Sequence, residues 1–226
     1  MADSRSQSAL GRLRGEAVEG FVQLVVEGEL KLEAKTSESR LTAQLGLSRT
    51  PVREALAILS AAGVVERRPQ VGVWARRVTS TELCQLLATA ERIVVPAVAA
   101  IPHTLGEDRR QQARELRQSA RALEDAVTDF AQRPHRLAQD RVLQADIDVL
   151  DRVMLVAGLA AAERWYVDIV GIERRLYQAD REMWSTGELR QRVCAALKLA
   201  QSVSRFASDA ASVTDAYFAL LRNLLW

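Results

Sequence analysis

The chain has 226 residues, of which 48% are hydrophobic and 27% charged, and its formal net charge is +2 at pH 7. This length and apolar content can build one large domain or two ordinary ones around a sizeable core. No apolar run approaches the roughly 18 residues that span a bilayer, and the polar N-terminus lacks the apolar segment of a secretory signal. We therefore expect a cytoplasmic protein that does not enter a membrane.

The positive charge is unevenly distributed along the chain. Residues 48–77 contain six arginines and two glutamates, whereas residues 79–226 carry 19 basic and 20 acidic side chains. A local basic segment in a nearly neutral chain is typical of a DNA-reading module joined to a domain with another task. It argues against a highly basic protein that coats DNA without regard to sequence.

Two helices are predicted in the first 45 residues. Residues 1–8 are small and polar, and we expect them to be disordered. Over Ala9–Glu27 the apolar residues recur with a period of 3.6, which predicts an amphipathic helix that ends at Gly28. A second helix is predicted over Ser37–Leu45, with Thr36 as its N-cap.

The segment LGLSRTPVREAL, residues 45–56, predicts a tight turn followed by a helix that runs to about residue 62. Gly46 tolerates the left-handed backbone that a sharp reversal between two helices requires. Ser48 or Thr50 can cap the second helix, and Pro51 suits its first position because its missing N–H costs nothing there. The apolar residues at helical spacing, which would face a core, are Val52, Ala55, Leu56 and Leu59.

Two arginines lie near the N-terminal end of this helix. Arg49 and Arg53 are four residues apart and therefore share a face. The recognition helix of a helix-turn-helix presents its N-terminal residues to base edges in the same way. Such a pair alone is as typical of a solvated surface helix, so the prediction depends on the whole segment.

A β-hairpin is predicted directly after this helix, which Gly63 ends. Residues 64–68 and 71–78 read as two short strands, with Gly72 near the tip, and complete a winged helix-turn-helix. A basic hairpin beside a recognition helix would follow the phosphates, and Gly72 would let the backbone approach a groove closely. A solvated hairpin is the alternative. The basic residues of the hairpin are Arg67, Arg68, Arg76 and Arg77.

A second, all-helical domain is predicted from residue 79. Thr79 or Ser80 can cap its first helix, and Glu82 favours the first turn. The chain is thus predicted to be mainly α, with a disordered tail (1–8), a winged helix-turn-helix domain (9–78) and an all-α helical bundle (79–226). The helices expected in the bundle span about residues 80–101, 106–131, 136–157, 159–181, 186–203 and 206–224.

The string SRTPVREAL, followed by an apolar stretch and Gly63, resembles the DNA-binding domain of the GntR family of bacterial transcription regulators. The resemblance implies base contacts from the recognition helix and a short strand that pairs with the wing, for which Leu30 and Leu32 alternate suitably. Relatives often carry an arginine where Ser39 stands, and Arg40 beside it is the candidate here. The DNA-binding residues predicted from the helix-turn-helix and the wing are Arg40, Ser48, Arg49, Thr50, Arg53, Arg67, Arg68 and Gly72.

The helical domain resembles the FCD-type domain of the FadR subgroup in helix count, spacing and a few residues. That resemblance implies a domain that dimerises, binds an effector and, in many members, holds a divalent metal between one Asp and three His. Here Asp146 matches the Asp position, but Leu150 and Leu189 stand where histidines would be. We therefore expect no metal and no other cofactor. The effector pocket would contain Asp146, Leu150, Leu189 and Arg92, with Arg92 paired to Asp146 or to an effector carboxylate.

These features predict a ligand-responsive transcriptional regulator, and repression is the commoner outcome in the family. A homodimer would bind a palindromic DNA operator, and a small-molecule effector would change the spacing of its recognition helices. An alternative is a regulator with a vestigial pocket, whose helical domain only dimerises. A helical enzyme with a fused DNA-binding domain is a third possibility, but no nucleophile–base pair, phosphate loop or metal cluster supports it. We therefore expect no enzymatic activity.

Overall fold

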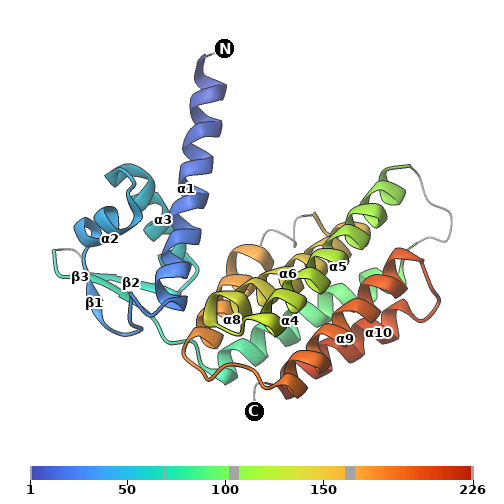
Figure 1. The fold of residues 1–226 in the computed structure, drawn as a ribbon. Coiled ribbons are helices and arrows are strands. Elements are labelled where there is room, and N and C mark those ends of the chain that lie inside the picture. The colour runs from blue at the N-terminus through green and yellow to red at the C-terminus, as the bar shows by residue number, and fades with distance from the viewer. Residues whose placement is uncertain (1, 69, 102–106, 161–165, 225–226) are drawn as a thin grey trace. The chain divides into compact units, whose positions relative to one another are not determined.

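The computed structural model describes residues 2–68, 70–101, 107–160 and 166–224. Its contacts divide the chain into two compact units, one of Met1–Val78 with Leu176–Arg181 and one of Thr79–Arg175 with Glu182–Trp226. The first unit carries three helices and a small antiparallel sheet among its described residues before residue 79, and helices dominate the second (Figure 1). The predicted fold class is confirmed.

The helices of the N-terminal unit are α1 (Ala2–Val26), α2 (Glu38–Leu45) and α3 (Arg49–Ala61), and α1 packs on both of the others. Phe21 and Val22 of α1 are fully buried in this packing. Residues 2–8, for which the sequence predicted disorder, are part of α1, which begins at Ala2. These residues are polar but include no glycine or proline, so nothing in them ends a helix.

The turn between α2 and α3 forms at Gly46, as predicted, with a left-handed φ of 65°. The N-cap of α2 is Ser37, whose hydroxyl accepts a backbone N–H, and not Thr36, which lies in a strand. Ser48 is the N-cap of α3, but its hydroxyl makes no cap hydrogen bond. Pro51 takes the third helical position and not the first. Its missing N–H still costs nothing, because the first four N–H groups of a helix have no partner within it.

The sheet contains β1 (Lys35–Thr36), β2 (Val65–Arg68) and β3 (Gly72–Ala75) in the order β1-β3-β2, with antiparallel pairing throughout. β2 and β3 form the predicted wing, with strands shorter than expected. Val73 and Ala75 of β3 are buried against the helices, which fixes the register of the hairpin.

The third strand does not lie at Leu30 and Leu32, where it was expected. The backbone N–H of Leu30 donates to the carbonyl oxygen of Leu24 at 2.9 Å, which closes the end of α1 and leaves Leu30 only 5% exposed. Glu33 then has a φ of 60°, which interrupts an extended chain. Extended pairing with the wing therefore begins only at Lys35.

Gly72 lies where the wing strand β3 passes close to β1. Its φ is 156°, and a Cβ at this position would lie 2.9 Å from the backbone oxygen of Thr36. Real Cβ atoms are not found this close to a backbone oxygen, so β1 leaves no room for a side chain. From the sequence we expected a glycine here to let the backbone approach DNA. The structure shows another reason for a glycine, which is the close contact between β3 and β1.

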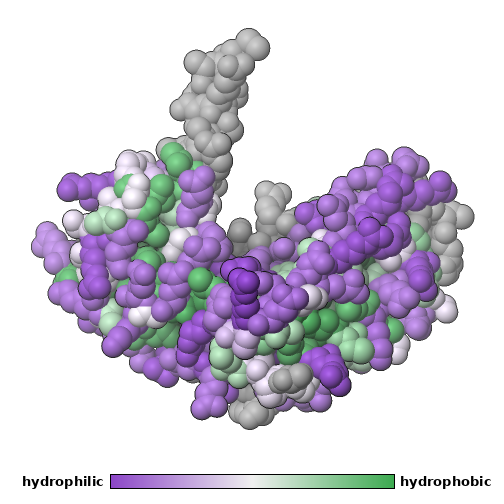
Figure 2. All heavy atoms as spheres, in the orientation of Figure 1, coloured by the Kyte–Doolittle hydropathy of each residue, from purple (hydrophilic) through white to green (hydrophobic). Residues whose placement is uncertain are grey.

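The helical unit is built mainly from α4 (Ser80–Ala99), α5 (Glu107–Gln132), α6 (Arg136–Val156), α9 (Thr186–Ser204) and α10 (Ala210–Asn223). α5 packs along α6 and α9, and α4 packs along α10. Leu87, Leu116 and Phe218 are among the residues buried between them. Hydrophilic residues cover most of the face shown in Figure 2. The described residues include no helix long and apolar enough to cross a bilayer.

The cap predicted at residue 79 is confirmed and is reciprocal. The Thr79 hydroxyl accepts the N–H of Glu82 at 3.2 Å, and the Glu82 carboxylate accepts the N–H of Thr79 at 2.9 Å. The helix expected over residues 159–181 differs from the prediction: residues 161–165 lie outside the described part, Tyr166–Gly171 form a π-helical segment, and α8 (Ile172–Ala179) follows.

We expect Gly72→Ala to lower the free energy of unfolding by about 1–3 kcal/mol, because the new methyl group must displace β1 or the wing. The matched control is Gly15→Ala on α1, where a Cβ meets no atom within 4 Å. That change should leave stability unchanged or raise it by about 0.5–1 kcal/mol. Urea denaturation measures both, and equal stability of Gly72→Ala and the wild type would contradict the assigned role.

Candidate functional site

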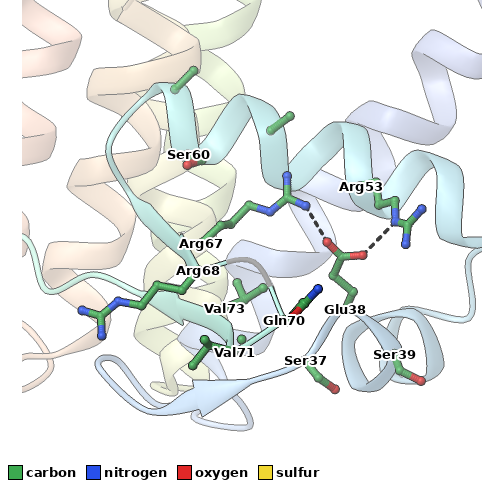
Figure 3. Close-up of a pocket in the computed structure, with 13 residues that line it drawn as sticks. Ser37, Glu38, Ser39, Arg53, Ser60, Arg67, Arg68, Gln70, Val71 and Val73 are labelled. Atoms are coloured by element: carbon green, nitrogen blue, oxygen red, sulfur yellow. Dashed lines mark hydrogen bonds and ion pairs between the residues drawn. The ribbon is translucent and has the colours of Figure 1, made fainter.

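A groove on the N-terminal unit lies between α2, α3 and the wing (Figure 3). Four predicted residues line this groove. They are Arg53 of α3, Arg67 and Arg68 of β2, and Gly72 of β3. The structure therefore brings four of the predicted DNA-binding residues to one surface.

The remaining predicted DNA-binding residues lie at the first turn of α3 and on α2. Ser48, Arg49 and Thr50 occupy the N-cap and the first two helical positions of α3, and all three are exposed. Because the Ser48 hydroxyl makes no cap hydrogen bond, it is available to a ligand. Arg40 is exposed on α2. These four residues do not line the groove, and their contact with DNA stays a prediction.

Glu38 of α2, which the sequence reading did not single out, joins two of the predicted arginines. Its Oε2 accepts from Arg53 Nε at 2.8 Å, and its Oε1 accepts from Arg67 Nη2 at 2.5 Å (Figure 3). The hydrogen bond from Arg53 is the main reason why the pKa of the Glu38 carboxyl lies below its usual value, and Arg67 adds to this against a smaller opposing effect of burial. The carboxylate is therefore ionised at neutral pH.

The other wing arginines also have partners within the protein. Arg68 Nε donates to Glu66 Oε1 at 2.7 Å, and its guanidinium lies 5.2 Å from the centre of the Trp74 ring. Arg76 Nη1 donates to the carbonyl oxygen of Gly63 at 2.7 Å, which satisfies a backbone group at the end of α3. Contact of the hairpin arginines with phosphates stays a prediction, and Arg76 has a structural role besides, because it holds the wing to the end of α3.

A second polar cluster is buried in the helical unit. Asp146 of α6 accepts a hydrogen bond from Arg174 of α8 and another, at 2.8 Å, from the Tyr217 hydroxyl of α10. Arg174 Nη1 also donates to the Tyr166 hydroxyl at 2.8 Å. Burial raises the pKa of both tyrosines, and the charge of Asp146 raises that of Tyr217 further. Both hydroxyls are therefore protonated, and Tyr217 is a donor.

Arg192 of α9 adds a second positive charge to this cluster. The residue is only 8% exposed, and its buried Nε has no hydrogen-bond partner among the described residues. Its guanidinium lies 4.7 Å from the centre of the Trp184 ring. Burial, and then the charge of Arg174, lower the pKa of Arg192 to about 10. The cluster therefore contains two arginines, and one buried N–H group of Arg192 has no acceptor among the described residues.

The structure corrects the pairing expected for the effector pocket. Asp146 is buried, and its partner is Arg174 and not Arg92, which is exposed on α4. Leu150 and Leu189 are buried at 0% and 6% exposure. Sequence reasoning missed Arg174 because residues 146 and 174 are distant in the chain, and nothing in the ERRLY segment distinguishes a buried arginine from a solvated one.

The surroundings of Asp146 do not fit a metal ion. Both of its carboxylate oxygens accept hydrogen bonds from cationic or hydroxyl donors, and the leucines nearby in the predicted pocket offer no ligand atom. Among the described residues, no three His, Cys, Asp or Glu side chains gather in a way that could hold an ion. The donor set matches an ion pair and not a coordination site.

We expect Asp146→Ala to lower the free energy of unfolding by about 3–5 kcal/mol, because it leaves the Arg174 guanidinium buried without its carboxylate. Arg92→Ala should change it by less than about 0.5 kcal/mol, because Arg92 is exposed. Chemical denaturation of the two variants distinguishes the observed pair from the expected one. A larger loss for Arg92→Ala than for Asp146→Ala would contradict it.

One solved structure is similar to almost the whole chain. The structure of E. coli McbR/YncC is similar over 94% of this chain and 96% of its own, with a TM-score of 0.71 and 17% sequence identity. At that identity the similarity establishes the fold alone.

Two curated relatives are similar in sequence to part of this chain. An HTH-type transcriptional regulator in an unstable DNA locus of Streptomyces ambofaciens is 35% identical over 83 residues, which are 37% of this chain and 35% of that protein. The probable D-xylose utilization operon transcriptional repressor of Paenarthrobacter nicotinovorans is 40% identical over 65 residues, which are 29% of each chain. The chain thus matches about a third of the length of these relatives.

A family model matches part of the N-terminal unit. Residues 13–74 match the model of the bacterial regulatory proteins of the gntR family. They include α2, α3 and most of the wing, with the turn at Gly46 and the segment SRTPVREAL. Over residues 13–74, the N-terminal unit of this chain is therefore similar to the bacterial regulatory proteins of the gntR family.

Proposed function

We propose that the chain is a DNA-binding transcriptional regulator, and a repressor in particular. The observation that carries the proposal is the first turn of α3, where Ser48, Arg49 and Thr50 are exposed within a domain that matches the GntR model. Relatives of that domain are named as transcriptional regulators, one of them as a repressor. The proposed activity needs contact with DNA in the cytoplasm and involves no enzymatic step.

The geometry supports different DNA contacts for α3 and for the wing. The N-terminal residues of α3 would enter the major groove, with Arg49 and Arg53 one helical turn apart on the face that reads bases. The wing would lie beside the helix, and its exposed Arg68 would contact a phosphate. Affinity should then fall steeply with salt, because phosphate contacts release counterions.

The proposed operator is palindromic and the proposed active species is a homodimer. A symmetric dimer presents two identical recognition helices, so each half-site of the operator repeats the other in inverted order. The helical unit would join the two copies, as the resemblance to the FadR subgroup implies. Sedimentation equilibrium at micromolar concentration tests this part, and a monomer that binds only single half-sites would contradict it.

The proposed effector is an acidic small molecule that binds in the helical unit without a metal ion. Support comes from the buried cluster, in which the Nε of Arg192 has no hydrogen-bond partner among the described residues and the charge of Arg174 also acts on Arg192. An effector carboxylate would supply an acceptor for this Nε and a negative charge beside the two arginines. The alternative is that the pocket is vestigial and the helical unit only dimerises.

For the DNA interface, we expect Arg49→Ala and Arg53→Ala each to weaken operator binding by about 1–3 kcal/mol, because each removes one arginine that reads a base or phosphate. The probe is the duplex that the wild type enriches from a random-sequence pool. Arg121→Ala, an exposed arginine of α5, is the control and should bind as the wild type does. Unchanged binding by both α3 variants would refute the assignment of the recognition helix.

For the effector, we expect a thermal-shift screen of carboxylates, sugar acids and acyl compounds to find a stabilising acid. A ligand at a hundred times its Kd adds about 2.7 kcal/mol to the free energy of unfolding. Arg192→Gln should lose this stabilisation, and Arg190→Gln, an exposed neighbour on α9, should keep it. If no compound stabilises the wild type, the vestigial pocket is favoured.

A further inference from the structure

The Glu38 carboxylate joins all three elements that line the groove. It belongs to α2, and it accepts from Arg53 of α3 at 2.8 Å and from Arg67 of β2 at 2.5 Å. The side chains of Glu38 and Arg67 are about one third exposed, at 32% and 33%, whereas that of Arg53 is 64% exposed. One carboxylate therefore fixes two arginines that belong to separate elements.

We propose that Glu38 is a positioning residue that determines sequence specificity on DNA, by holding Arg53 and Arg67 in one fixed arrangement. This inference rests on the proposed function and assigns Glu38 a role that a surface ion pair alone does not have. Glu38 is not proposed to touch a base. It acts through the two arginines.

The atom through which Arg53 contacts Glu38 indicates that the carboxylate positions the arginine and does not block its contact with DNA. Glu38 binds Arg53 through Nε, and this leaves Nη1 and Nη2 for another acceptor. In Figure 3 the dashed line from the carboxylate ends at Arg53 Nε and not at either terminal nitrogen. Those two groups form the fork that pairs with guanine O6 and N7 or with two phosphate oxygens. A carboxylate that blocked the arginine would take that fork.

Fixing the arginines in advance also lowers the cost of binding. An arginine side chain loses up to about 2 kcal/mol of rotamer entropy when it becomes fixed. Glu38 restrains Arg53 and Arg67 before DNA arrives, so less of this entropy is lost in the complex. The gain is available only to a DNA sequence that places its acceptors where the restrained arginines point.

The charge of Glu38 also penalises other sequences. If an arginine leaves Glu38 to reach a phosphate in a different position, the carboxylate faces the DNA backbone without its partner. Repulsion between the carboxylate and the phosphates then opposes that binding mode. Glu38 is thus expected to strengthen binding to the matching sequence and to weaken binding to the others.

The test compares two duplexes, the one enriched by the wild type from a random pool and a scrambled duplex of the same composition. We expect Glu38→Gln to reduce the ratio of the two affinities by roughly tenfold or more, with affinity for the scrambled duplex unchanged or higher. The matched control is Glu66→Gln. It removes the same charge from the wing, where Glu66 pairs with Arg68, and should keep the ratio within about twofold of the wild type.

A second comparison separates positioning from general effects on the fold. In an Arg53→Ala background, Glu38→Gln should change the affinity ratio by much less than in the wild type, because the residue that it positions is absent. Glu38→Asp keeps the charge but shortens the side chain, and should give a ratio between those of the wild type and Glu38→Gln. Circular dichroism shows whether Glu38→Gln folds. If it does not, the affinity ratio of Glu38→Asp decides the test.

Four results would overturn the inference. Equal tightening on both duplexes would make Glu38 a simple competitor for the arginines. Equal weakening on both, or the same loss of ratio in the Arg53→Ala background, would make it a structural residue only. If the wild type enriches no sequence and binds both duplexes alike, the proposed function fails as well, and that outcome is distinct from the other three.

Discussion

The N-terminal unit depends on the burial of one face of α3. Leu59, Leu56 and Val52 are at most 2% exposed and pack among α1, α2 and β2. Because a helix has 3.6 residues per turn, burying this face turns the positions between them outward. Arg49 and Arg53 are therefore directed to solvent by the packing of the apolar residues. The surface that we propose for DNA binding therefore lies opposite the face of α3 that is buried in the core.

The two units use carboxylate–arginine pairs in physically different settings. Glu38, Arg53 and Arg67 are partly exposed, so their pairs contribute little to stability and their value lies in holding side chains in place. Asp146 and Arg174 are almost completely buried, so removing one partner would leave an uncompensated charge in the core. The same chemistry thus orients side chains at the surface and constrains the packing of helices in the interior.

Local signals in the sequence were sufficient for the outline of the fold. The glycine at position 46, the reciprocal cap at Thr79 and Glu82, and the hairpin after Gly63 each involve neighbouring residues, and the structure has them where they were predicted. The sequence did not predict where the third strand lies. The strand expected at Leu30 lies at Lys35, because the end of α1 and the left-handed Glu33 use the residues before it. Polarity alone likewise did not indicate the helix over residues 2–8.

The sequence by itself determined the type of the N-terminal domain, because a turn, a cap and an apolar periodicity lie within a few residues of each other. Only the tertiary structure decided which charged groups meet. Glu38 and Arg67 are 29 residues apart, and Asp146 and Arg174 are 28 residues apart. Every glutamate and arginine has the same local preference for a solvated helix or strand, so the chain contains no signal for its partner. The pairing follows from the packing of whole helices, which is a property of the folded chain.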